Sequence, residues 1–468
     1  MGITFGTSGW RAIIAEEFTY ANVRLVTQAI ASVLNEERTG GAMIVGYDTR
    51  FLSEHFAAAC AAEFAGLGFE SYLTNRETPT PVISYCIRTK GARGGINFTA
   101  SHNPPQYNGM KFSTADGAPA LPEITKRIEQ RITELQAGTA QPPATTSKAK
   151  AIELNPLEDY LASLADKIDF AKLASAKLKL AYDPLWGTGR GYLDEALRRH
   201  GCEVTNVHDY RDVLFGGFSP EPSERNLREM RALVLEKGLA LGVSTDGDAD
   251  RFGFIDRDGS FVSANHLLAI LLDYLCETRP HWTGGVARSV ATTHLLDRVA
   301  ARHGRESFET PVGFKFIGEL INADKIILGG EESAGLTVKG HFPEKDGILA
   351  CLLVAEMVAA RGASLGEMIA ELFTKDGALY SDRRGIKLTP EVKARLSERL
   401  QADPPARIGE RAVTGVNRMD GVKYLFDDGS WMLLRMSGTE PVVRCYAETH
   451  TKEDLEVLLE TGSQFVLS

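Results

Sequence analysis

One order of apolar and polar stretches recurs along the chain. A short apolar run leads into a polar loop, then into an amphipathic stretch with helical spacing, a glycine and a second apolar run. It appears first where residues 42–49 (AMIVGYDT) are followed by a helical pattern through about Phe64, then by Gly68 and FESYLT. The order returns over residues 178–207 and 284–312. Each copy predicts a strand–helix–strand unit.

Units of this kind favour parallel or mixed sheets flanked by helices. In such sheets, ligands bind at the loops that follow the carboxyl ends of the strands. We therefore expect functional residues in the loop after the first strand of each unit.

The last hundred residues follow a different pattern. Predicted helices over about 389–402 and 452–465 enclose four strand-like runs, and Asp-Asp-Gly between two of the runs predicts a hairpin turn. The four runs are ERAVTGV, GVKYLF, SWMLLRM and VVRCYAE. This pattern predicts a small α+β domain.

A chain of 468 residues is too long for one compact core. Residues 137–151 (AGTAQPPATTSKAKA) are poor in bulky apolar side chains and are typical of a linker. We expect three similar α/β domains with mixed sheets and a smaller α+β C-terminal domain around a central cleft. The expected domains are 1–146, 147–255, 256–373 and 374–468.

Composition narrows the possible partners. The formal charge of −10 argues against a broad nucleic-acid surface, so any anion site must be built locally from arginines, lysines, backbone N–H groups or metals. The six cysteines are scattered without a C-x-x-C pair, as in a reducing compartment. The sequence has neither a signal-peptide pattern at its start nor an apolar run of membrane-spanning length. We expect a cytoplasmic monomer or homodimer that binds neither nucleic acid nor membrane.

The strongest local signal is STDGDADRFGFID. A strand-like run, LALGVST, leads into Asp246, Asp248 and Asp250. At i, i+2 and i+4 of an extended segment, three carboxylates would converge, and all-oxygen ligands suit Mg²⁺ or Ca²⁺. An EF-hand loop is excluded because Arg251 and Arg257 stand where it needs Gly and Glu. An acidic solvated turn is the alternative.

The second signal is NFTASHNPPQYNGMKF, residues 97–112. It places Ser101 and His102 in a loop rich in Gly, Asn and Pro, ten residues before Lys111. A serine hydroxyl needs a base, a metal or a lowered pKa to act as a nucleophile. Taken alone, the segment is more typical of a structural loop than of a catalytic one.

Three weaker motifs complete the set. RMSGTEPVVR, between Arg435 and Arg444, offers hydroxyls, backbone donors and arginine forks for phosphate, or forms a simple hairpin turn. GGEESAG (329–335) offers carboxylates for sugar hydroxyls, or caps a helix start. FGTSGWR (5–11) is a Gly-rich opening that is also typical of a flexible terminus. Phosphate-loop, dinucleotide and G-x-S-x-G motifs are all incomplete or missing.

In this order, the five segments resemble the α-D-phosphohexomutase family. FGTSGWR, TASHNPPQYNGMKF, DGDADR, GGEESAG and RMSGTEP look like its start, phosphoserine, metal, sugar and phosphate loops. The resemblance spans the chain. It implies an intramolecular phosphotransferase, an isomerase like phosphoglucomutase, with hexose 1-phosphate and 6-phosphate as substrates and a hexose 1,6-bisphosphate intermediate.

The resemblance also implies a role for each matching residue. Ser101 would carry the phosphoryl group, Mg²⁺ would bridge that phosphate and the three aspartates, and Arg251 would add positive charge. Proton transfer would fall to Lys111, with His102 and Arg11 as further candidates. The substrate-binding residues implied are Thr7, Ser8, Lys315, Glu331, Ser333, Arg435, Ser437, Gly438, Thr439 and Arg444.

The preferred sugar is predicted from two segments. Family members that act on mannose or glucosamine phosphates tend to end the sugar motif in Gly-His, whereas this chain has Ala334-Gly335. That ending and PVGFKFIG, which contains Lys315, resemble the glucose branch. The same branch implies that Lys345 takes the acid/base role of the missing histidine.

Three alternatives stay open at this point. The chain could prefer mannose or glucosamine phosphate within the same family. It could be a metal-dependent phosphatase, with water as the acceptor. It could also be a non-catalytic sugar-phosphate binder, which would not need Ser101, Lys111 and three metal carboxylates together.

Overall fold

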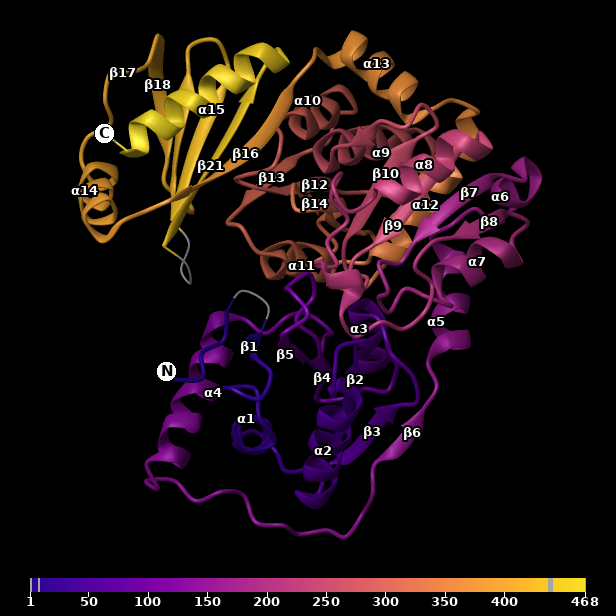
Figure 1. Cartoon of the computed structure of the whole chain (residues 1–468), viewed down its shortest axis with the longest axis vertical. Coiled ribbons are helices and arrows are strands. Elements are labelled where there is room, and N and C mark those ends of the chain that lie inside the picture. Colours follow the sequence, from indigo (N-terminus) through magenta and orange to yellow (C-terminus); the bar gives the residue numbers. More distant parts are fainter. Residues whose placement is uncertain (1, 7–8, 437–440, 468) are drawn as a thin grey trace. The chain divides into compact units, whose positions relative to one another are not determined.

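The computed structural model describes residues 2–6, 9–436 and 441–467 (Figure 1). The chain forms two compact units. The first comprises Met1–Val262, Gly318–Asp324 and Ser333–Leu365, and the second comprises Ser263–Ile317, Lys325–Glu332 and Gly366–Ser468. Each unit contains strands of more than one sheet.

The first sheet of unit 1 contains the first predicted strand–helix–strand unit. Strands β2 and β3 are parallel, and β2 is also parallel to β4, as predicted. Strands β5 and β1 extend the sheet antiparallel to β4. In sheet order the strands are β1 (Trp10–Ile13), β5 (Tyr107–Thr114), β4 (Gly94–Phe98), β2 (Ala42–Tyr47), β3 (Glu70–Thr74) and β6 (Ile152–Leu154).

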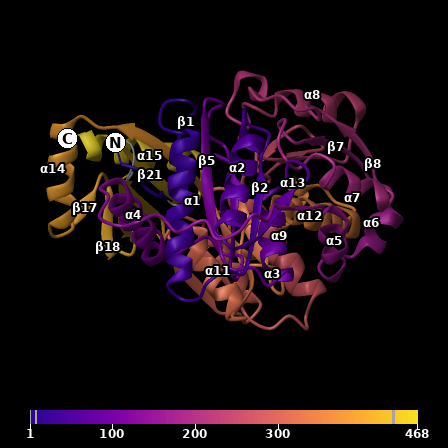
Figure 2. The same cartoon turned by 90° about the horizontal axis from the view of Figure 1, so that it is seen from below.

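Four helices belong to this sheet: α1 (Tyr20–Asn35), α2 (Ser53–Gly66), α3 (Thr80–Thr89) and α4 (Pro122–Gln136). Helix α1 lies beside α2 and α4, as Figures 1 and 2 both show. It buries Val23, Val26 and Ile30, which follow one another at helical spacing, and Thr19 caps its first turn. The central strand β4 is buried on both faces, as expected for a strand covered by helices on both sides.

The second sheet of unit 1 contains the second predicted repeat. Strand β7 is parallel to both β8 and β9, and β10 returns antiparallel to β9. In order the strands are β11 (Phe261–Val262), β10 (Phe252–Asp256), β9 (Leu241–Thr245), β7 (Lys179–Asp183) and β8 (Glu203–Asn206). The helices of this part are α5 (Leu157–Ser163), α6 (Phe170–Ala176), α7 (Leu193–Arg199), α8 (Arg228–Lys237) and α12 (Gly347–Arg361). No helix or strand occupies 139–151, in line with the predicted linker.

Unit 2 begins with the third predicted repeat. Strand β12 (Gly285–Ser289) is parallel to β13 (Ser307–Thr310) and β14 (Ile326–Glu331). Strand β15 (Gly335–Val338) belongs to the four-stranded sheet with the order β13, β12, β14 and β15. The helices along this stretch are α9 (Ala264–Thr278), α10 (Leu295–Arg302), α11 (Phe314–Asn322) and α13 (Leu365–Asp376). All three repeats predicted from the apolar pattern are therefore confirmed as parallel strand–helix–strand units.

The rest of unit 2 is an antiparallel sheet against which α15 packs (Figure 1). In order it contains β16 (Tyr380–Lys387), β21 (Val442–Thr449), β20 (Trp431–Met436), β19 (Val422–Phe426), β18 (Arg411–Asn417) and β17 (Arg407–Ile408), with α14 (Pro390–Gln401) and α15 (Lys452–Leu467). The other face of this sheet packs Trp431, Leu433 and Tyr446 against Val290 and Ala291 of the preceding domain.

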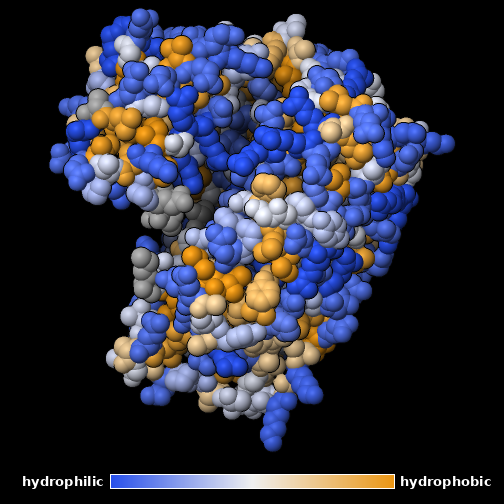
Figure 3. All heavy atoms as spheres, viewed as in Figure 1, coloured by the Kyte–Doolittle hydropathy of each residue, from blue (hydrophilic) through white to orange (hydrophobic). Residues whose placement is uncertain are grey.

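The predicted fold class is confirmed: three α/β domains with mixed sheets precede a smaller C-terminal domain with an antiparallel sheet. The exact boundaries given for the four domains stay predictions. Most of the face shown in Figure 3 is hydrophilic. Within the described residues no single helix is long and apolar enough to cross a membrane; one bent pair, α12 with α13, passes by length and composition.

Candidate active site

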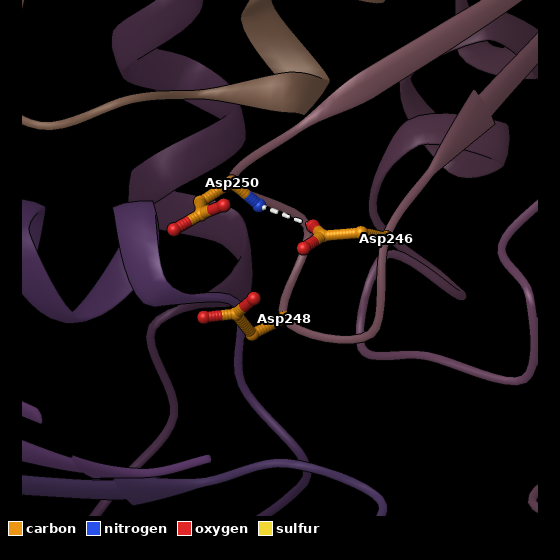
Figure 4. Close-up of side chains that lie close together, drawn as sticks. All are labelled: Asp246, Asp248 and Asp250. Atoms are coloured by element: carbon orange, nitrogen blue, oxygen red, sulfur yellow. Dashed lines mark hydrogen bonds between the residues drawn. The ribbon is translucent and has the colours of Figure 1, made fainter. Parts of the chain in front are cut away.

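Three buried carboxylates gather in the loop between β9 and β10. One oxygen from each of Asp246, Asp248 and Asp250 lies within 4.8 Å of the others, and Figure 4 shows the three side chains around one small space. We predicted from the sequence that the three aspartates lie on an extended segment, and that prediction is wrong. The chain turns after β9, and Ala249 adopts a left-handed φ of 55°. The carboxylates converge because the loop curls around them.

Backbone donors stabilise this curl. The Oδ1 atom of Asp246 accepts hydrogen bonds from the backbone N–H of Asp250 (3.0 Å) and of Arg251 (3.1 Å). Gly247 is required at the tip, because a Cβ there would lie 2.8 Å from the carbonyl oxygen of Ser101. The loop is thus shaped for close contact with a second loop.

The second loop, between β4 and β5, holds Ser101. Its hydroxyl donates to Asp246 Oδ2 at 2.9 Å and lies 3.2 Å from His102 Nδ1. Ser101 is buried and has a left-handed φ of 53°, a strained conformation for a residue with a side chain. The structure therefore brings together the serine and metal motifs, which lie 145 residues apart.

The three aspartates suit a divalent cation. The Oδ1 atoms of Asp248 and Asp250 are buried and have no hydrogen-bond partner among the described residues. Burial, with the charges of Asp248 and Asp250, holds the pKa of Asp246 well above its usual value. Open carboxylate oxygens are the ligands that hard cations prefer, so the cluster could bind a metal.

Two lysines lie against the same cluster. Lys111 Nζ donates to Asp248 Oδ2 (2.5 Å) and Asp250 Oδ2 (2.9 Å), and Lys345 Nζ lies 3.2 Å from Asp250 Oδ2 and 3.0 Å from Glu344 Oε1. Burial alone would raise the pKa of Asp250, but the two ammonium groups outweigh it and lower that pKa. Burial alone would lower the pKa of Lys111, but Asp248 and Asp250 raise it, so Lys111 is protonated.

The other cationic candidates lie next to Ser101. Arg11 donates to Asn103 Oδ1 at 2.6 Å. Arg251 Nε is buried without a hydrogen-bond partner in the described part of the chain, so it can donate to a bound anion. The charge of Arg251, followed by burial, lowers the pKa of His102 well below its usual value and keeps the imidazole neutral.

The sugar-motif residues fall in both units. In unit 2, Glu331 ends β14, and its Oε1 accepts from the backbone N–H of Gly313 at 2.8 Å. Lys315 lies in the first turn of α11, two residues after Gly313. Ser333 is half-buried in unit 1. Residues 332–334 form a turn and not the start of a helix, so the helix-capping interpretation is wrong.

The phosphate motif lies at the end of the C-terminal sheet. Arg435 and Arg444 are directly opposite each other on β20 and β21. Arg435 Nε donates to Asp420 Oδ2 at 2.9 Å, and the same oxygen accepts from the backbone N–H of Val312. The other residues predicted for the two phosphate-binding loops lie outside the described residues: Thr7, Ser8, Ser437, Gly438 and Thr439.

Sequence reasoning missed several residues of this site. Thr80 donates its hydroxyl to Asp248 Oδ2 at 2.5 Å, yet no pattern around it marks a site. Glu344, buried next to Lys345, was also missed. Arg50, which forms an ion pair with Asp48, donates to the backbone carbonyl oxygen of Ser101. Asp48 directly follows a buried strand, a position where functional loops were expected, and that signal was available.

Known protein families match this chain along most of its length. Models of phosphoglucomutase/phosphomannomutase domains match in order: the alpha/beta/alpha domain I over residues 2–139, domain II over 158–259, domain III over 263–375 and the C-terminal domain over 391–461.

Full-length relatives and a solved structure give the same picture. A protein of Thermococcus kodakarensis named phosphoglucomutase/phosphomannomutase is 30% identical, with 99% of this chain and 98% of the relative aligned. A "probable phosphoglucosamine mutase" of Methanothermobacter thermautotrophicus is also 30% identical, over 97% of this chain and 96% of the relative. A crystal structure from Thermus thermophilus, described as a putative phosphomannomutase, covers both chains completely with a TM-score of 0.87 and 34% identity.

Proposed function

The chain belongs to the phosphoglucomutase/phosphomannomutase family, and from that premise we propose that it is a magnesium-dependent phosphohexomutase that interconverts glucose 1-phosphate and glucose 6-phosphate. One observation carries the proposal. The Ser101 hydroxyl, in a strained loop, donates to one of three buried carboxylates that suit a metal ion. A phosphoryl group on this oxygen would lie between the metal ligands and Arg251.

Charge balance supports a phosphorylated Ser101. The three aspartates carry three negative charges, and Lys111, Lys345 and Arg251 supply three positive ones. A phosphoryl group adds about two negative charges, which a divalent cation on the aspartates would offset. When Mg²⁺ is bound, it supplies Lewis-acid stabilisation of the transferring group. Arg251, with its open Nε, would donate to the phosphoryl oxygens.

The reaction consists of two transfers. In the first, the bond between phosphorus and Ser101 Oγ breaks as phosphorus bonds to the free sugar hydroxyl. The proton of that hydroxyl leaves to a neighbouring base, and Ser101 Oγ takes up a proton from a neighbouring acid. The products are a hexose 1,6-bisphosphate and a free serine hydroxyl. After the intermediate reorients, the bond between its other phosphorus and the sugar oxygen breaks as that phosphorus bonds to Ser101 Oγ. The serine proton leaves to a base, and the sugar oxygen takes up a proton to become a hydroxyl.

Lysine side chains are the main candidates for supplying protons in these steps, because Lys111 is protonated. Lys111 and Lys345 both contact Asp250, so their ammonium groups lie beside the proposed transfer site. Neutral His102 contacts Ser101 Oγ and can take or return the serine proton, while Arg11 holds the serine loop through Asn103. Positioned proton transfer of this kind contributes about 10²–10⁴-fold to rate.

The non-reacting end of the substrate needs its own contacts. We propose that Arg435, Arg444 and the loop between them bind the distal phosphate, together with Thr7 and Ser8. Glu331, Ser333 and Lys315 would bind the sugar. The hydrogen bond from Gly313 to Glu331 supports this assignment, because it joins the GGEESAG and PVGFKFIG segments, which were both predicted to bind the sugar.

Glucose is the sugar best supported by the residues. Relatives of equal identity are named for glucose, mannose and glucosamine phosphates, so overall similarity does not distinguish them. Local packing does. A Cβ at Gly335 would lie 2.2 Å from Lys345 Cδ, so Lys345 fills the space of a side chain at position 335. Lys345 thereby replaces the histidine of the Gly-His branches.

A substrate panel tests the proposal. Glucose, mannose and glucosamine 1-phosphates are supplied with Mg²⁺ and catalytic hexose 1,6-bisphosphate, and the 6-phosphate is measured. We expect kcat/KM for glucose phosphate to be roughly five- to a hundredfold higher, since an epimer leaves one buried oxygen of Glu331 unpaired. Glu331→Gln should reduce kcat/KM for glucose phosphate more than for the other two sugar phosphates. Glu456→Gln on α15, the control, should leave kcat/KM for all three unchanged. Higher kcat/KM for mannose or glucosamine phosphate would replace glucose and keep the mutase, and a chain inactive on all three would be a binder.

A further inference from the structure

The guanidinium of Arg50 is completely buried and lies against the Ser101 loop. All five of its N–H groups are used. Nη2 donates to the carbonyl oxygens of Ser101 (2.7 Å) and Asn103 (2.6 Å), and Nη1 to those of Pro104 (2.8 Å) and Tyr107 (2.9 Å). Nε donates to Asp48 Oδ2 at 3.1 Å. Three of the five bonds thus go to the backbone of the Ser101 loop, and a fourth goes to Tyr107, the residue at which the loop enters β5.

The position of Arg50 is itself fixed by contacts with Asp48 and Phe215. Asp48 directly follows β2, and its Oδ1 accepts from the backbone N–H of Arg50 and from the Ser53 hydroxyl, both at 2.9 Å. The backbone N–H of Asp48 donates to the carbonyl oxygen of Phe98, the last residue of β4. The guanidinium also lies 5.0 Å from the ring centroid of buried Phe215. Arg50 therefore has little freedom to move, and it links the loop to two central strands.

The loop needs such a support. Its carbonyls turn inward, where they would be unsatisfied without a donor. Ser101 has a φ of 53°, which a serine adopts only when its surroundings impose it. Its carbonyl oxygen also lies where a Cβ on Gly247 would clash at 2.8 Å, so a small shift of this oxygen would press on the metal loop. The guanidinium holds that oxygen.

We propose that Arg50 is the positioning residue of phosphoryl transfer: it sets the orientation of the Ser101 hydroxyl towards Asp246 by binding four backbone carbonyls at once. The proposal rests on the mutase function proposed above and adds a residue that never contacts the substrate. Both half-reactions use Ser101, so the loss of Arg50 should slow both. Substrate contacts in unit 2 are unaffected, so KM should hardly change.

Arg50→Lys provides the test, because it keeps the charge and loses the fork that reaches four carbonyls. Arg93→Lys is the matched control. Arg93, directly before β4, is another buried arginine, and it donates to the carbonyls of Leu34 at the end of α1 and of Arg38 in the loop before β2. We expect kcat of Arg50→Lys to fall by about 10–100-fold with KM within about threefold, and Arg93→Lys to keep both.

A second readout does not depend on activity. Amide hydrogen exchange over residues 99–109 should accelerate in Arg50→Lys and match the parent protein in Arg93→Lys. If Arg50→Lys does not fold, Asp48→Asn, which keeps the shape and weakens the support of Arg50, should show the same two changes to a smaller degree.

The outcomes separate the two proposals. Normal kcat per folded molecule, or unchanged exchange in the loop of a variant that folds, would overturn the positioning role and leave the mutase intact. A parent protein without mutase activity would overturn the mutase, while the exchange experiment would still show whether Arg50 orders the loop.

Discussion

Asp246 differs from the two other carboxylates of the cluster. Lys111 and Lys345 pair with Asp248 and Asp250, whereas Asp246 has no lysine or arginine at salt-bridge distance in the described part of the chain. Among the described residues, its oxygens accept hydrogen bonds only from two backbone N–H groups and the Ser101 hydroxyl. Without a cation, its charge is buried among like charges.

Asp246→Asn keeps the shape, because the amide oxygen can accept both backbone bonds and the amide nitrogen can donate to Ser101. We expect apo stability to be unchanged or higher, and Mg²⁺ affinity to fall at least about tenfold, with turnover following. Calorimetric Mg²⁺ titration and unfolding in a chelator measure the two effects. Asp166→Asn, at an 87% exposed side chain, is the control. Unaltered Mg²⁺ binding would contradict the metal assignment.

The difference in unfolding free energy between the parent protein and Asp246→Asn should depend on pH. Burial and its neighbours raise the pKa of Asp246 above the ordinary 3.8, so the folded apo protein binds this proton more tightly than the unfolded chain. That contribution is complete below pH 3.8 and is lost as the pH rises through the raised pKa. The stability of the parent relative to Asp246→Asn should therefore fall as the pH rises from about 4 towards neutrality, as measured by denaturant unfolding in a chelator. A rise would contradict the charge argument.

Gly335 tests the packing of Lys345. In Gly335→Ala the new Cβ would displace the Lys345 side chain, whose Cδ lies 2.2 Å away, and would move the ammonium from Asp250. We expect kcat to fall by about 10²–10⁴-fold, the size of one proton-transfer contribution, with Tm nearly unchanged because a flexible side chain gives way. Gly385→Ala on β16, whose Cβ would meet only Val442 at 3.7 Å, should alter neither. Full activity in Gly335→Ala would exclude Lys345 as the acid/base.

At the scale of elements, strand ends supply the functional loops. The Ser101 loop follows β4, the aspartate loop follows β9, Glu331 ends β14 and Arg435 lies near the end of β20. Placing the site at strand ends needs only rigid strands and short loops, and the sheets provide both.

The phosphate loop is the element whose contribution can be isolated. Arg435→Ala removes a charge-assisted donor, worth about 1.5–3 kcal/mol, so KM should rise roughly ten- to a hundredfold. Turnover should fall less, because the role proposed for Arg435 is to bind the phosphate that is not being transferred. Arg384→Ala, which removes an exposed arginine of the same domain paired with Glu456 and Glu460, should leave KM unchanged. An unchanged KM in Arg435→Ala would place the distal phosphate elsewhere.

The elements were largely predictable because each repeats a short-range pattern. The strands around 42–47, 179–183 and 285–289 were evident as apolar runs, and their helices as amphipathic stretches. The antiparallel addition of β1 and β5 was not predictable, because pairing between distant strands leaves no local pattern. The aspartate motif predicted convergence correctly but not its cause, since the left-handed Ala249 cannot be read from the residue type. Arg50 and Thr80 were missed because their partners lie far away in the sequence.

At the scale of the whole molecule, the proposed roles divide between the two units. Ser101, the aspartates and both lysines belong to the first unit, whereas Glu331, Lys315 and the two arginines of the phosphate motif belong to the second. Ser333, proposed to bind the sugar, is the exception, because it belongs to the first unit. We therefore predict that variants of Ser101, the aspartates and the lysines alter the transfer step, and that variants of Glu331, Lys315 and the two arginines alter substrate binding.

The most direct test of the central claim is transfer of a labelled phosphoryl group from Ser101. Enzyme loaded with labelled phosphate from hexose 1,6-bisphosphate is freed of excess label and mixed with unlabelled glucose 1-phosphate and Mg²⁺. The account predicts that peptide mapping finds the label on Ser101, that the label passes in the first turnover into glucose bisphosphate and glucose 6-phosphate, and that Ser101→Ala takes up none. Release of the label as inorganic phosphate at the rate of turnover, or full activity in Ser101→Ala, would contradict it.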